Sequence, residues 1–349
     1  MKRNNDKNSM FYLALLSILT VTMIAIVFIT KTRNKITVTD SADSIDYVNN
    51  TVESVKQNET FLDPSIEKWQ EGVIEYNGEK YKYNDRLKVY LLMGIDKKGV
   101  VEEAQNYTSG GQSDANFLLV VDTENMKLSV VSINRNIMTD IVVYTEYGDE
   151  LGTMPQQLCL QHAYGDGKKL SCNLSVNAVS KLFYNVPIDG YIAINMGAIP
   201  MLNDYVGGVE VEVLPGADGF NEGDVVTLHG EEAYQYIRNR DINEFNSASY
   251  RQKRHEQYIN AYFKKLEQMQ DNGLGMSGIP ALYNSIADYM VSSVDFVTFV
   301  QELFLYNYDE NNMYIVPGEM QQGEVWEEYI VDQDEFYDLI MEVFYKKVE

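Results

Sequence analysis

Three unbroken apolar runs constrain the fold of this 349-residue chain more than any other feature. They are Lys88–Gly94 (KVYLLMG), Ala115–Val121 (ANFLLVV) and Leu128–Asn134 (LSVVSIN). A strand with one solvated face alternates apolar and polar residues, whereas these runs do not alternate. They therefore predict strands that are buried on both faces, as in a sheet covered by helices.

Helical patterns follow the apolar runs and alternate with two more strands. Val176–Phe183 has an apolar helical face, Ala198–Tyr205 ends at a glycine pair suited to a helix C-cap, and Tyr258–Leu266 predicts a long amphipathic helix. The strands are expected at Tyr191–Asn195 and Val209–Val213. This alternation predicts an α/β fold, a three-layer α/β/α sandwich.

The N-terminal segment predicts a membrane anchor. Met10–Thr30 holds no charged residue over 21 positions, about the length that a helix needs to cross a bilayer, and no Ala-x-Ala site follows it. We expect residues 1–9 to be a cytoplasmic tail, residues 10–30 a single-pass signal anchor and residues 31–70 an extracellular stalk. The basic residues flanking the span are balanced, so the outside location rests on the small N-terminal tail and the large C-terminal body.

Two further segments flank the predicted sheet. Residues 71–85 contain Asn77-Gly78 between alternating apolar and polar residues, which predicts a β-hairpin. Residues 270–349 are acidic, but Asp332-x-x-Glu335 resembles a capping box and is followed by an apolar helical face. We expect these last residues to form a small, packed C-terminal α/β subdomain.

The charge distribution is uneven. The formal net charge is -24, which argues against a nucleic-acid partner because phosphate backbones are also negative. Yet the stretch 236–254 (YIRNRDINEFNSASYRQKR) gathers five basic residues. Such a cluster suits an anionic ligand; the alternative is a salt-bridged helix start, given Asp241, Glu244 and Glu256 nearby.

Common catalytic signatures are missing from the sequence. It contains no GxSxG or HExxH, and HAYGDGKKLS lacks the first glycine and the Ser or Thr of a phosphate-binding loop. The three histidines are widely spread: we expect His255 on a helix surface, and His162 and His229 in structural or turn positions.

Charged residues stand at the ends of the three apolar runs. Asp96 follows the first run, Asp114 precedes the second and Arg135 follows the third. Each alone is compatible with a solvated turn. Together they suggest a site at one edge of the sheet, since carboxylates suit Mg²⁺ and guanidinium groups suit phosphate oxygens.

Seven segments, in order, resemble the LytR-CpsA-Psr family over residues 86–268. These segments are VYLLMGID, GGQSDANFLLVV, SINRN, HAYGDG, MGAIPMLNDYVGGVEVEV, LHGEEAYQYIRNR and RQKR. The resemblance implies a catalytic domain over 86–268 and an extracytoplasmic enzyme on the membrane of a Gram-positive-type bacterium. Such an enzyme moves an anionic glycopolymer, of the teichoic acid or capsular polysaccharide type, from a polyprenyl pyrophosphate carrier to peptidoglycan.

The resemblance also implies roles for individual residues. Asp96 and Asp114 match the acids that bind Mg²⁺ (or Mn²⁺), and the isoprenoid tail is expected in an apolar cavity between sheet and helices. The arginines that match those gripping the pyrophosphate are Arg135, Arg238, Arg240 and Arg251. Arg135, Arg238 and Asp114 are the expected catalytic residues, whereas Lys253 and Arg254 suit packing or the surface equally well.

Three positions depart from the family pattern. Asn136 and Ala248 stand where acids are common, and Cys159 stands where a lysine is common. The general base is therefore not evident; Asp140, Asp241 and Glu244 are candidates by proximity alone. Two other functions stay open: a non-catalytic scaffold or regulator that binds pyrophosphate lipids, and a pyrophosphate-lipid hydrolase.

The chain has two cysteines, Cys159 and Cys172. Neither belongs to a CxxC pair, which argues against a zinc site. In an extracellular body a disulfide between them is expected, and the alternative is a pair of buried free thiols.

Overall fold

The structure is a computed structural model, and it describes residues 72–239, 247–271, 276–323 and 326–348. These residues belong to one compact unit, Asp63–Glu349. The tail, anchor and stalk predicted over residues 1–70 lie outside the described residues. Within the described ranges, no helix combines the length and apolar character needed to cross a bilayer.

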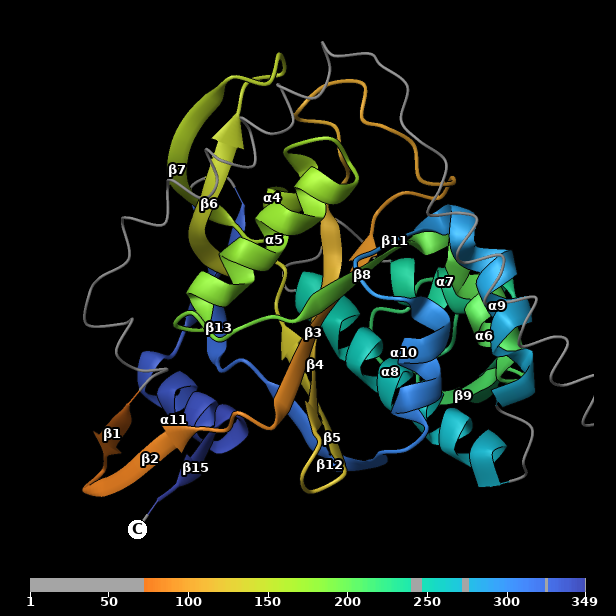
Figure 1. The fold of residues 1–349 in the computed structure, drawn as a ribbon. Coiled ribbons are helices and arrows are strands. Elements are labelled where there is room, and N and C mark those ends of the chain that lie inside the picture. The colour runs from red at the N-terminus through yellow and green to blue at the C-terminus, as the bar shows by residue number, and fades with distance from the viewer. Residues whose placement is uncertain (1–71, 240–246, 272–275, 324–325, 349) are drawn as a thin grey trace, which may run out of the picture. The chain divides into compact units, whose positions relative to one another are not determined.

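A six-stranded mixed sheet lies at the centre of the fold, in the order β11-β8-β3-β4-β5-β12 (Figure 1). β3–β4, β4–β5 and β8–β11 are antiparallel, whereas β3–β8 and β5–β12 are parallel. The three apolar runs form β3, β4 and β5, as predicted. The strand bounds are β3 Leu87–Ile95, β4 Ser113–Asp122, β5 Lys127–Ile133, β8 Gly190–Asn195, β11 Met290–Ser292 and β12 Asn307–Ile315.

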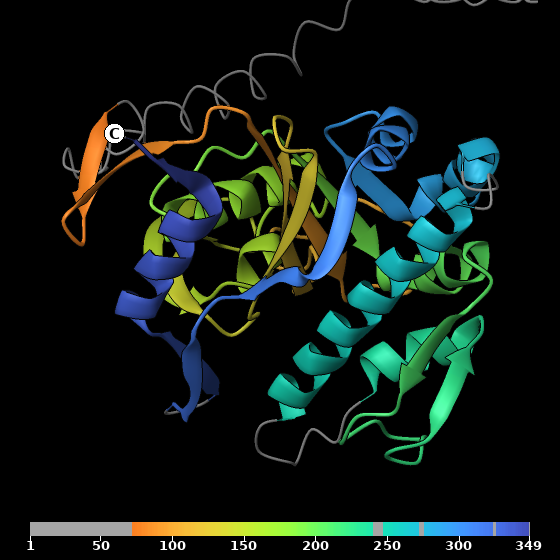
Figure 2. The ribbon, with the colours of Figure 1, turned by 90° about the horizontal axis from the view of Figure 1, so that it is seen from below.

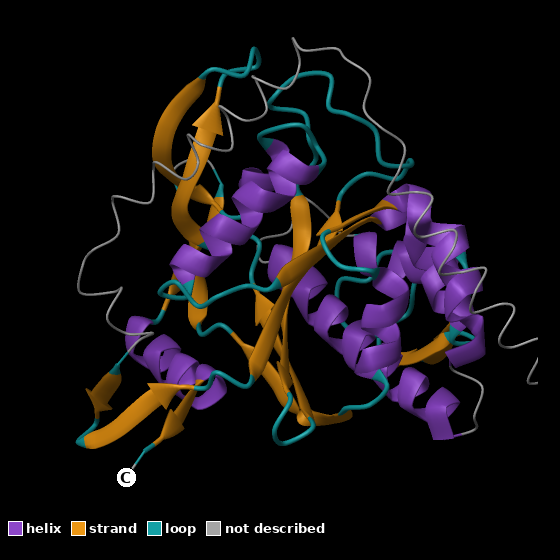
Figure 3. Ribbon diagram, viewed as in Figure 1, coloured by secondary structure: helices purple, strands orange, loops and turns teal. Residues whose placement is uncertain are grey.

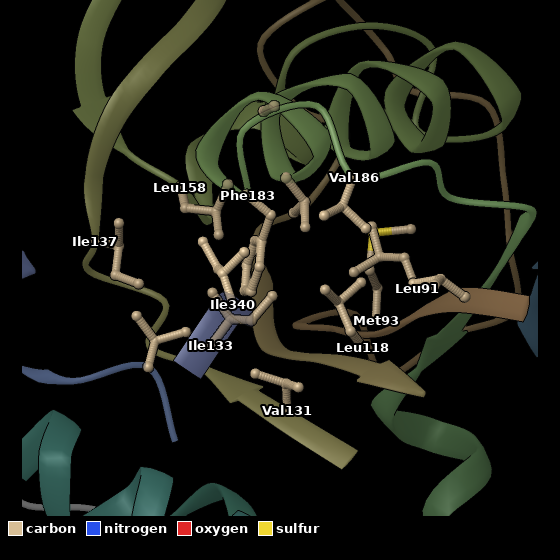
Figure 4. Packing of buried hydrophobic residues seen from close by; sticks show 14 of the residues in the cluster. Leu91, Met93, Leu118, Val131, Ile133, Ile137, Leu158, Phe183, Val186 and Ile340 are labelled. Atoms are coloured by element: carbon tan, nitrogen blue, oxygen red, sulfur yellow. The ribbon is translucent and has the colours of Figure 1, made fainter. Parts of the chain in front are cut away.

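Helices cover both faces of this sheet, which explains why its strands are apolar throughout. Leu118 and Leu119 are consecutive in β4 and fully buried, yet they belong to different hydrophobic clusters because strand side chains alternate between faces. Leu118 faces α5 (Lys169–Leu182) and α11 (Gln333–Phe344), in the cluster shown in Figure 4. Figure 2 shows α11 and α8 on opposite sides of the strands.

The opposite face, with Leu119, is covered by four helices. They are α6 (Ile199–Tyr205), α8 (Ser247–Asp271), α9 (Ile279–Ile286) and α10 (Phe296–Leu303). α8 contains the predicted amphipathic helix. α6 ends as predicted at Gly207 and Gly208, whose amides donate to the carbonyls of Asp204 and Asn203 at 3.0 and 3.1 Å.

One predicted strand lies outside the central sheet. β9 (Val209–Glu212) pairs with β10 (Val225–Leu228) in a separate two-stranded sheet. Its buried valines pack in a third apolar cluster with α7 (Glu231–Arg238) and the face of α8 near Tyr258. The alternation in VEVEV, unlike the continuous runs, indicates a strand with one buried face, and that is how the segment folds.

The predicted hairpin is present near the start of the described chain. β1 (Val73–Tyr76) and β2 (Glu79–Tyr83) pair through Asn77 and Gly78, which both have positive φ. β2 also pairs with β15 (Tyr345–Lys347), close to the end of the chain. The hairpin is thus part of a three-stranded sheet whose third strand the sequence did not reveal (Figure 3).

The residues after 270 are not a separate subdomain, contrary to our expectation. β11 and β12 are the two edge strands of the central sheet, and α11 contributes Phe336, Ile340 and Phe344 to the main hydrophobic cluster. The predicted cap of α11 is correct, since Asp332 accepts from the amides of Asp334 and Glu335 at 3.1 Å. These residues complete the main domain because their apolar side chains fill its core.

Two further hairpins contact the loop after β5. They are β6–β7 (Met138–Tyr144 and Glu150–Gln157) and β13–β14 (Gly318–Gln322 and Glu327–Val331). The short helix α4 (Leu160–Ala163) follows β7. The amide of Tyr329 in β14 donates to the carbonyl of Asn136 at 2.9 Å, so the C-terminal part of the chain holds the loop that carries Arg135.

Candidate active site

The directions of β3, β4 and β5 bring three predicted site residues to the same end of these strands. β3 ends at Ile95, opposite Ser113 at the start of antiparallel β4, and Ile133 at the end of β5 pairs with Asn116 near the same end of β4. Asp96, Asp114 and Arg135 therefore meet, although up to 39 positions separate them in the sequence.

Asp114 lies between two arginines. One of its carboxylate oxygens is 2.7 Å from Nη1 of Arg135, and the other is 2.8 Å from Nη1 of Arg251. The three side chains are only 7%, 13% and 6% exposed. Two guanidinium groups thus converge on one carboxylate in a buried place, and their N–H groups suit an anionic ligand.

Arg135 is positioned by two further side chains. Its Nη2 donates to Oε1 of Gln112 and to Sγ of Cys159, the latter at 2.8 Å. Its Nε is buried and has no hydrogen-bond partner among the described residues. A buried donor without a partner costs free energy, so this N–H is a natural contact for a ligand oxygen.

Asp96 lies at the exposed margin of the group. One of its carboxylate oxygens accepts from the backbone amide of Gln112 at 2.8 Å. Desolvation, and then repulsion by Asp114, raise the pKa of Asp96. The two acids are thus close enough to repel each other, the arrangement that a bound cation relieves.

Only two of the four predicted arginines come together in the described residues. Arg251, in the first turns of α8, joins Arg135 on Asp114. Arg238 is exposed at the end of α7, where its guanidinium lies 5.8 Å from the ring centre of Tyr234, and no described contact joins it to Asp114. Arg240 falls outside the described residues.

Arg254 has a structural role. The sequence left packing or a surface position open for it, and the structure shows packing. It is fully buried and donates to the carbonyls of Tyr236 (2.9 Å), Pro215 (3.2 Å) and Asn239. These bonds tie α8 to the end of α7.

His255 is buried, so our prediction of a helix-surface position is wrong. Its Nε2 lies 2.9 Å from the carbonyl of Ile237. Burial, helped by the charge of Arg251, lowers the pKa of His255 to about 3. The ring is therefore neutral at pH 7. It is buried because it lies on the inward-facing side of the amphipathic helix α8. His162 and His229 are structural and turn residues, as expected.

The predicted disulfide does not form in this structure. Cys159 and Cys172 are both buried and free. Cys159 contacts Arg135, whereas Sγ of Cys172 lies 3.7 Å from Nε2 of His162. Burial raises the pKa of both thiols, so they stay protonated at neutral pH. The alternative of two buried thiols is the one that the structure adopts.

A large apolar cavity of about 370 Å³ opens beside the arginine pair. It lies between the sheet and helices α6, α8, α9 and α10, where we expected an isoprenoid tail. Typical lining residues are Phe117 and Ile192 from the sheet, Phe263 from α8, Leu282 from α9 and Phe299 from α10. We call it the apolar cavity.

A small polar pocket of about 10 Å³ adjoins the apolar cavity. Ala115, Phe117 and His255 line both spaces. The remaining lining residues of this polar pocket are Asp114, Asn116, Ser132, Ile133, Arg135, Arg251 and Gln252. The charged group thus lies where the polar pocket adjoins the apolar cavity.

Sequence reasoning missed four polar residues of this region: Gln112, Ser132, Gln252 and Glu256. Glu256 was considered only as a surface ion-pair partner, yet it is buried and bonded to Ser132. Ser132 carries a signal that was available in the sequence: it is a hydroxyl inside the otherwise apolar end of VVSI in β5. A polar residue within a strand buried on both faces needs a polar partner.

Comparisons with known proteins agree with this geometry. The model of the LytR_cpsA_psr family matches residues 45–339, most of the chain. The chain belongs to the LytR_cpsA_psr family. The resemblance seen in the seven segments is confirmed, and it extends into the C-terminal residues that complete the central sheet.

Curated relatives include proteins named TagU. A protein of Bacillus cereus named polyisoprenyl-teichoic acid–peptidoglycan teichoic acid transferase TagU is 32% identical over 179 residues, covering 50% of this chain and 51% of the relative. A TagU protein of Enterococcus faecalis is 27% identical over 211 residues, covering 59% and 61%. The chain therefore spans about half to three-fifths of the length of these relatives.

Solved structures share the fold. The structure of B. subtilis TagV has a TM-score of 0.56 at 18% identity, covering 74% of this chain and 97% of that chain. TagT bound to LI-WTA has a TM-score of 0.54 at 17% identity, covering 74% and 90%. The mixed α/β fold is thus the fold of this family.

Proposed function

We propose that the protein is an extracytoplasmic phosphotransferase that moves an anionic glycopolymer from a polyprenyl pyrophosphate carrier to peptidoglycan. The observation that carries the proposal is the buried guanidinium pair of Arg135 and Arg251 at the mouth of the apolar cavity. A polyprenyl pyrophosphate has the same two parts: a doubly charged headgroup and a long hydrocarbon tail. The names of the TagU relatives support the same reaction class.

The headgroup would replace part of the Asp114 contacts. The guanidinium groups present N–H donors to phosphate oxygens, and the buried Nε of Arg135 supplies one that has no protein partner. Asp114 keeps both guanidinium groups in a fixed orientation before the ligand arrives. A preoriented donor stabilises the charge that develops in the transition state, since it does not have to reorganise during the reaction.

Mg²⁺, or Mn²⁺, is part of the proposal. The described residues hold no cluster of three or more acidic, histidine or cysteine ligands, but Mg²⁺ is often held by one or two carboxylates with substrate phosphates completing its shell. Asp96 and Asp114 fit this donor set. A bound divalent ion would neutralise phosphate charge and polarise the phosphorus centre.

The reaction follows from this placement. The acceptor hydroxyl of the glycan attacks the sugar-side phosphorus in line, a phosphodiester forms, and polyprenyl phosphate leaves with the electron pair of the broken P–O bond. Arg135 and Arg251 stabilise the equatorial oxygens. The tail stays in the apolar cavity, which fixes the position of the headgroup.

We also propose that residues 10–30 anchor the protein in the cell membrane, with the body outside the cell. The acceptor and the lipid-linked donor meet at that surface. A body anchored there reaches the carrier headgroup without leaving the membrane.

The test is an assay with full-length protein in detergent, a polyprenyl pyrophosphate-linked glycan donor and a muramyl-containing acceptor. We expect an acceptor-linked phosphodiester and released polyprenyl phosphate, both reduced by EDTA and restored by Mg²⁺. Asp114→Ala should lose most transfer. Donor binding without any turnover would support a scaffold instead, and release of glycan phosphate independent of the acceptor would support a hydrolase.

A further inference from the structure

The polar pocket has the size of one hydroxyl group. Its volume of about 10 Å³ is close to the smallest space that holds a single water molecule. A diphosphate does not fit in it, so the headgroup belongs at the mouth of the apolar cavity. The polar pocket, lined by Arg135, Arg251 and Ser132, is instead a place for one oxygen beside the reacting phosphorus.

Ser132 connects this pocket to a buried carboxylate. Its hydroxyl donates to Oε1 of Glu256 at 2.7 Å and accepts from Nε2 of Gln252 at 3.2 Å. Gln252 also donates to the same Oε1 at 2.8 Å. A serine hydroxyl has one donor and two acceptor positions, and these contacts use the donor and one acceptor. The second acceptor position is left for a group in the pocket.

Glu256 is unusual among the acids of this chain. It is only 8% exposed, and none of the ion pairs formed by the described residues includes it. Burial raises its pKa, while hydrogen bonds from Ser132 and Gln252 and the charge of Lys253 oppose the rise. Tyr329, from β14, is near enough for the charge of Glu256 to help raise its pKa, after burial as the main cause. A buried carboxylate without a cation is costly, and such groups often have a catalytic role.

The other acids of the region are poorly placed for proton transfer. Each carboxylate oxygen of Asp114 is already occupied by an arginine, so neither is directed at the acceptor hydroxyl. Asp140 is exposed in β6. Asp241 and Glu244 fall outside the described residues. Glu256, by contrast, is buried, belongs to none of the ion pairs of the described residues and accepts a hydrogen bond from Ser132 in the polar pocket.

We propose that the polar pocket seats the acceptor hydroxyl on Ser132, and that Glu256, acting through Ser132, is the proton acceptor of the transfer reaction. This inference rests on the proposed function and supplies the base that Asn136 and Ala248 leave unassigned.

The acceptor oxygen forms its bond to the sugar-side phosphorus as its proton passes to Oγ of Ser132. Ser132 gives its own proton to Oε1 of Glu256. The bond from phosphorus to the bridging oxygen breaks, and polyprenyl phosphate leaves with that electron pair. Glu256 later returns the proton to solvent, so neither Ser132 nor Glu256 is consumed.

The experiment compares Glu256→Gln and Ser132→Ala with wild type in the transferase assay across a pH series. Wild-type transfer should rise with pH as Glu256 ionises. Because a positioned base contributes at least about 100-fold, both variants should lose roughly that factor in kcat, and Glu256→Gln should also lose the rise with pH. Ser132→Thr, which keeps a hydroxyl, should recover much of the rate.

Measuring the binding of the lipid-linked donor distinguishes a role of Ser132 and Glu256 in proton transfer from a purely structural role. Both variants should bind the donor as tightly as wild type, which also shows that they fold. Glu210→Gln, on the exposed side of β9, is the matched control and should match wild type in rate and pH profile.

Three results would overturn the inference. The first is a Glu256→Gln variant with the wild-type rate. The second is a slow variant that keeps the wild-type rise with pH. The third is a Ser132→Ala variant that transfers normally. In each of these cases the wild type still transfers, so the proposed function survives. If the wild type makes no acceptor-linked product, both the proposed function and the role of Glu256 are overturned.

Discussion

The two faces of the central sheet are built from the same strands but are filled differently. On the face with Leu118, side chains such as Phe183, Val186 and Ile340 pack into a continuous core (Figure 4). The rings of Phe183 and Phe336 make an edge-to-face contact there, with their centroids 5.0 Å apart. On the face with Leu119, four helices enclose an apolar cavity of about 370 Å³. The first face supplies stability and the second leaves space for a ligand, because a protein core filled to its usual density has no room for one.

Removing an aromatic ring from each face of the sheet is the most direct test of this difference in packing. Phe183 is fully buried on the face with Leu118, so Phe183→Ala should lower the free energy of unfolding by about 4 kcal/mol. Phe117→Ala, on the cavity side, should cost less because one side of that ring already borders empty space. Urea denaturation measures both, and equal losses would mean that the two faces are equally packed.

Removing a cation at the cavity mouth should affect activity rather than folding. Arg135→Ala should lower the transfer rate about 100-fold, since it removes a donor aimed at the phosphate oxygens. The exposed Arg86→Ala is the control and should retain the wild-type rate. Steady-state kinetics with the lipid-linked donor decides the matter, and an Arg135→Ala enzyme as fast as wild type would refute the site.

The histidine that lines the cavity should make the fold sensitive to acid. In the folded state the pKa of His255 is about 3, below its ordinary value near 6.5, so the unfolded state binds more protons between these values. Stability from this residue is intact above pH 6.5 and is lost as the pH falls. Between pH 7 and pH 5 the free energy of unfolding should fall by about 2 kcal/mol through this residue.

The His255→Gln variant isolates this effect. Between pH 7 and pH 5 the free energy of unfolding of this variant should fall by about 2 kcal/mol less than that of wild type. His229→Gln, at an exposed position, should behave as wild type. An identical pH dependence for His255→Gln and wild type would show that His255 is not buried as a neutral ring.

The cysteines should give the smallest effect. Because Cys159 and Cys172 are free thiols, dithiothreitol should leave the Tm unchanged. Titration of the unfolded protein without reductant should find two thiols per chain. Fewer thiols would indicate a disulfide, and Arg135 would then lack its sulfur contact.

Much of the fold was predictable because its signals are local. Continuous apolar runs gave β3, β4 and β5, Asn77-Gly78 gave the first hairpin, and Asp332 gave the start of α11. Capping, turns and periodicity depend on neighbours within a few residues, which a sequence displays directly. The family match rests on the same kind of local segments.

The partners of each element were not predictable. The sequence predicts a separate subdomain for the last 80 residues, but β11 and β12 are the two edge strands of the central sheet. His255 was expected at the surface, and Glu256 was expected in a surface ion pair. Each of these depends on which distant segment covers a given face, and no short-range pattern records that.

The sequence by itself determined which residues of this protein are buried in strands, where its charged motifs stand, and that these motifs belong to one family. Only the tertiary structure decided that Arg135 and Arg251 share Asp114, that Glu256 reaches Ser132, and that the cysteines stay apart. The physical reason is that local propensity is set by adjacent residues, whereas burial and pairing are set by strand order and helix packing across the whole chain.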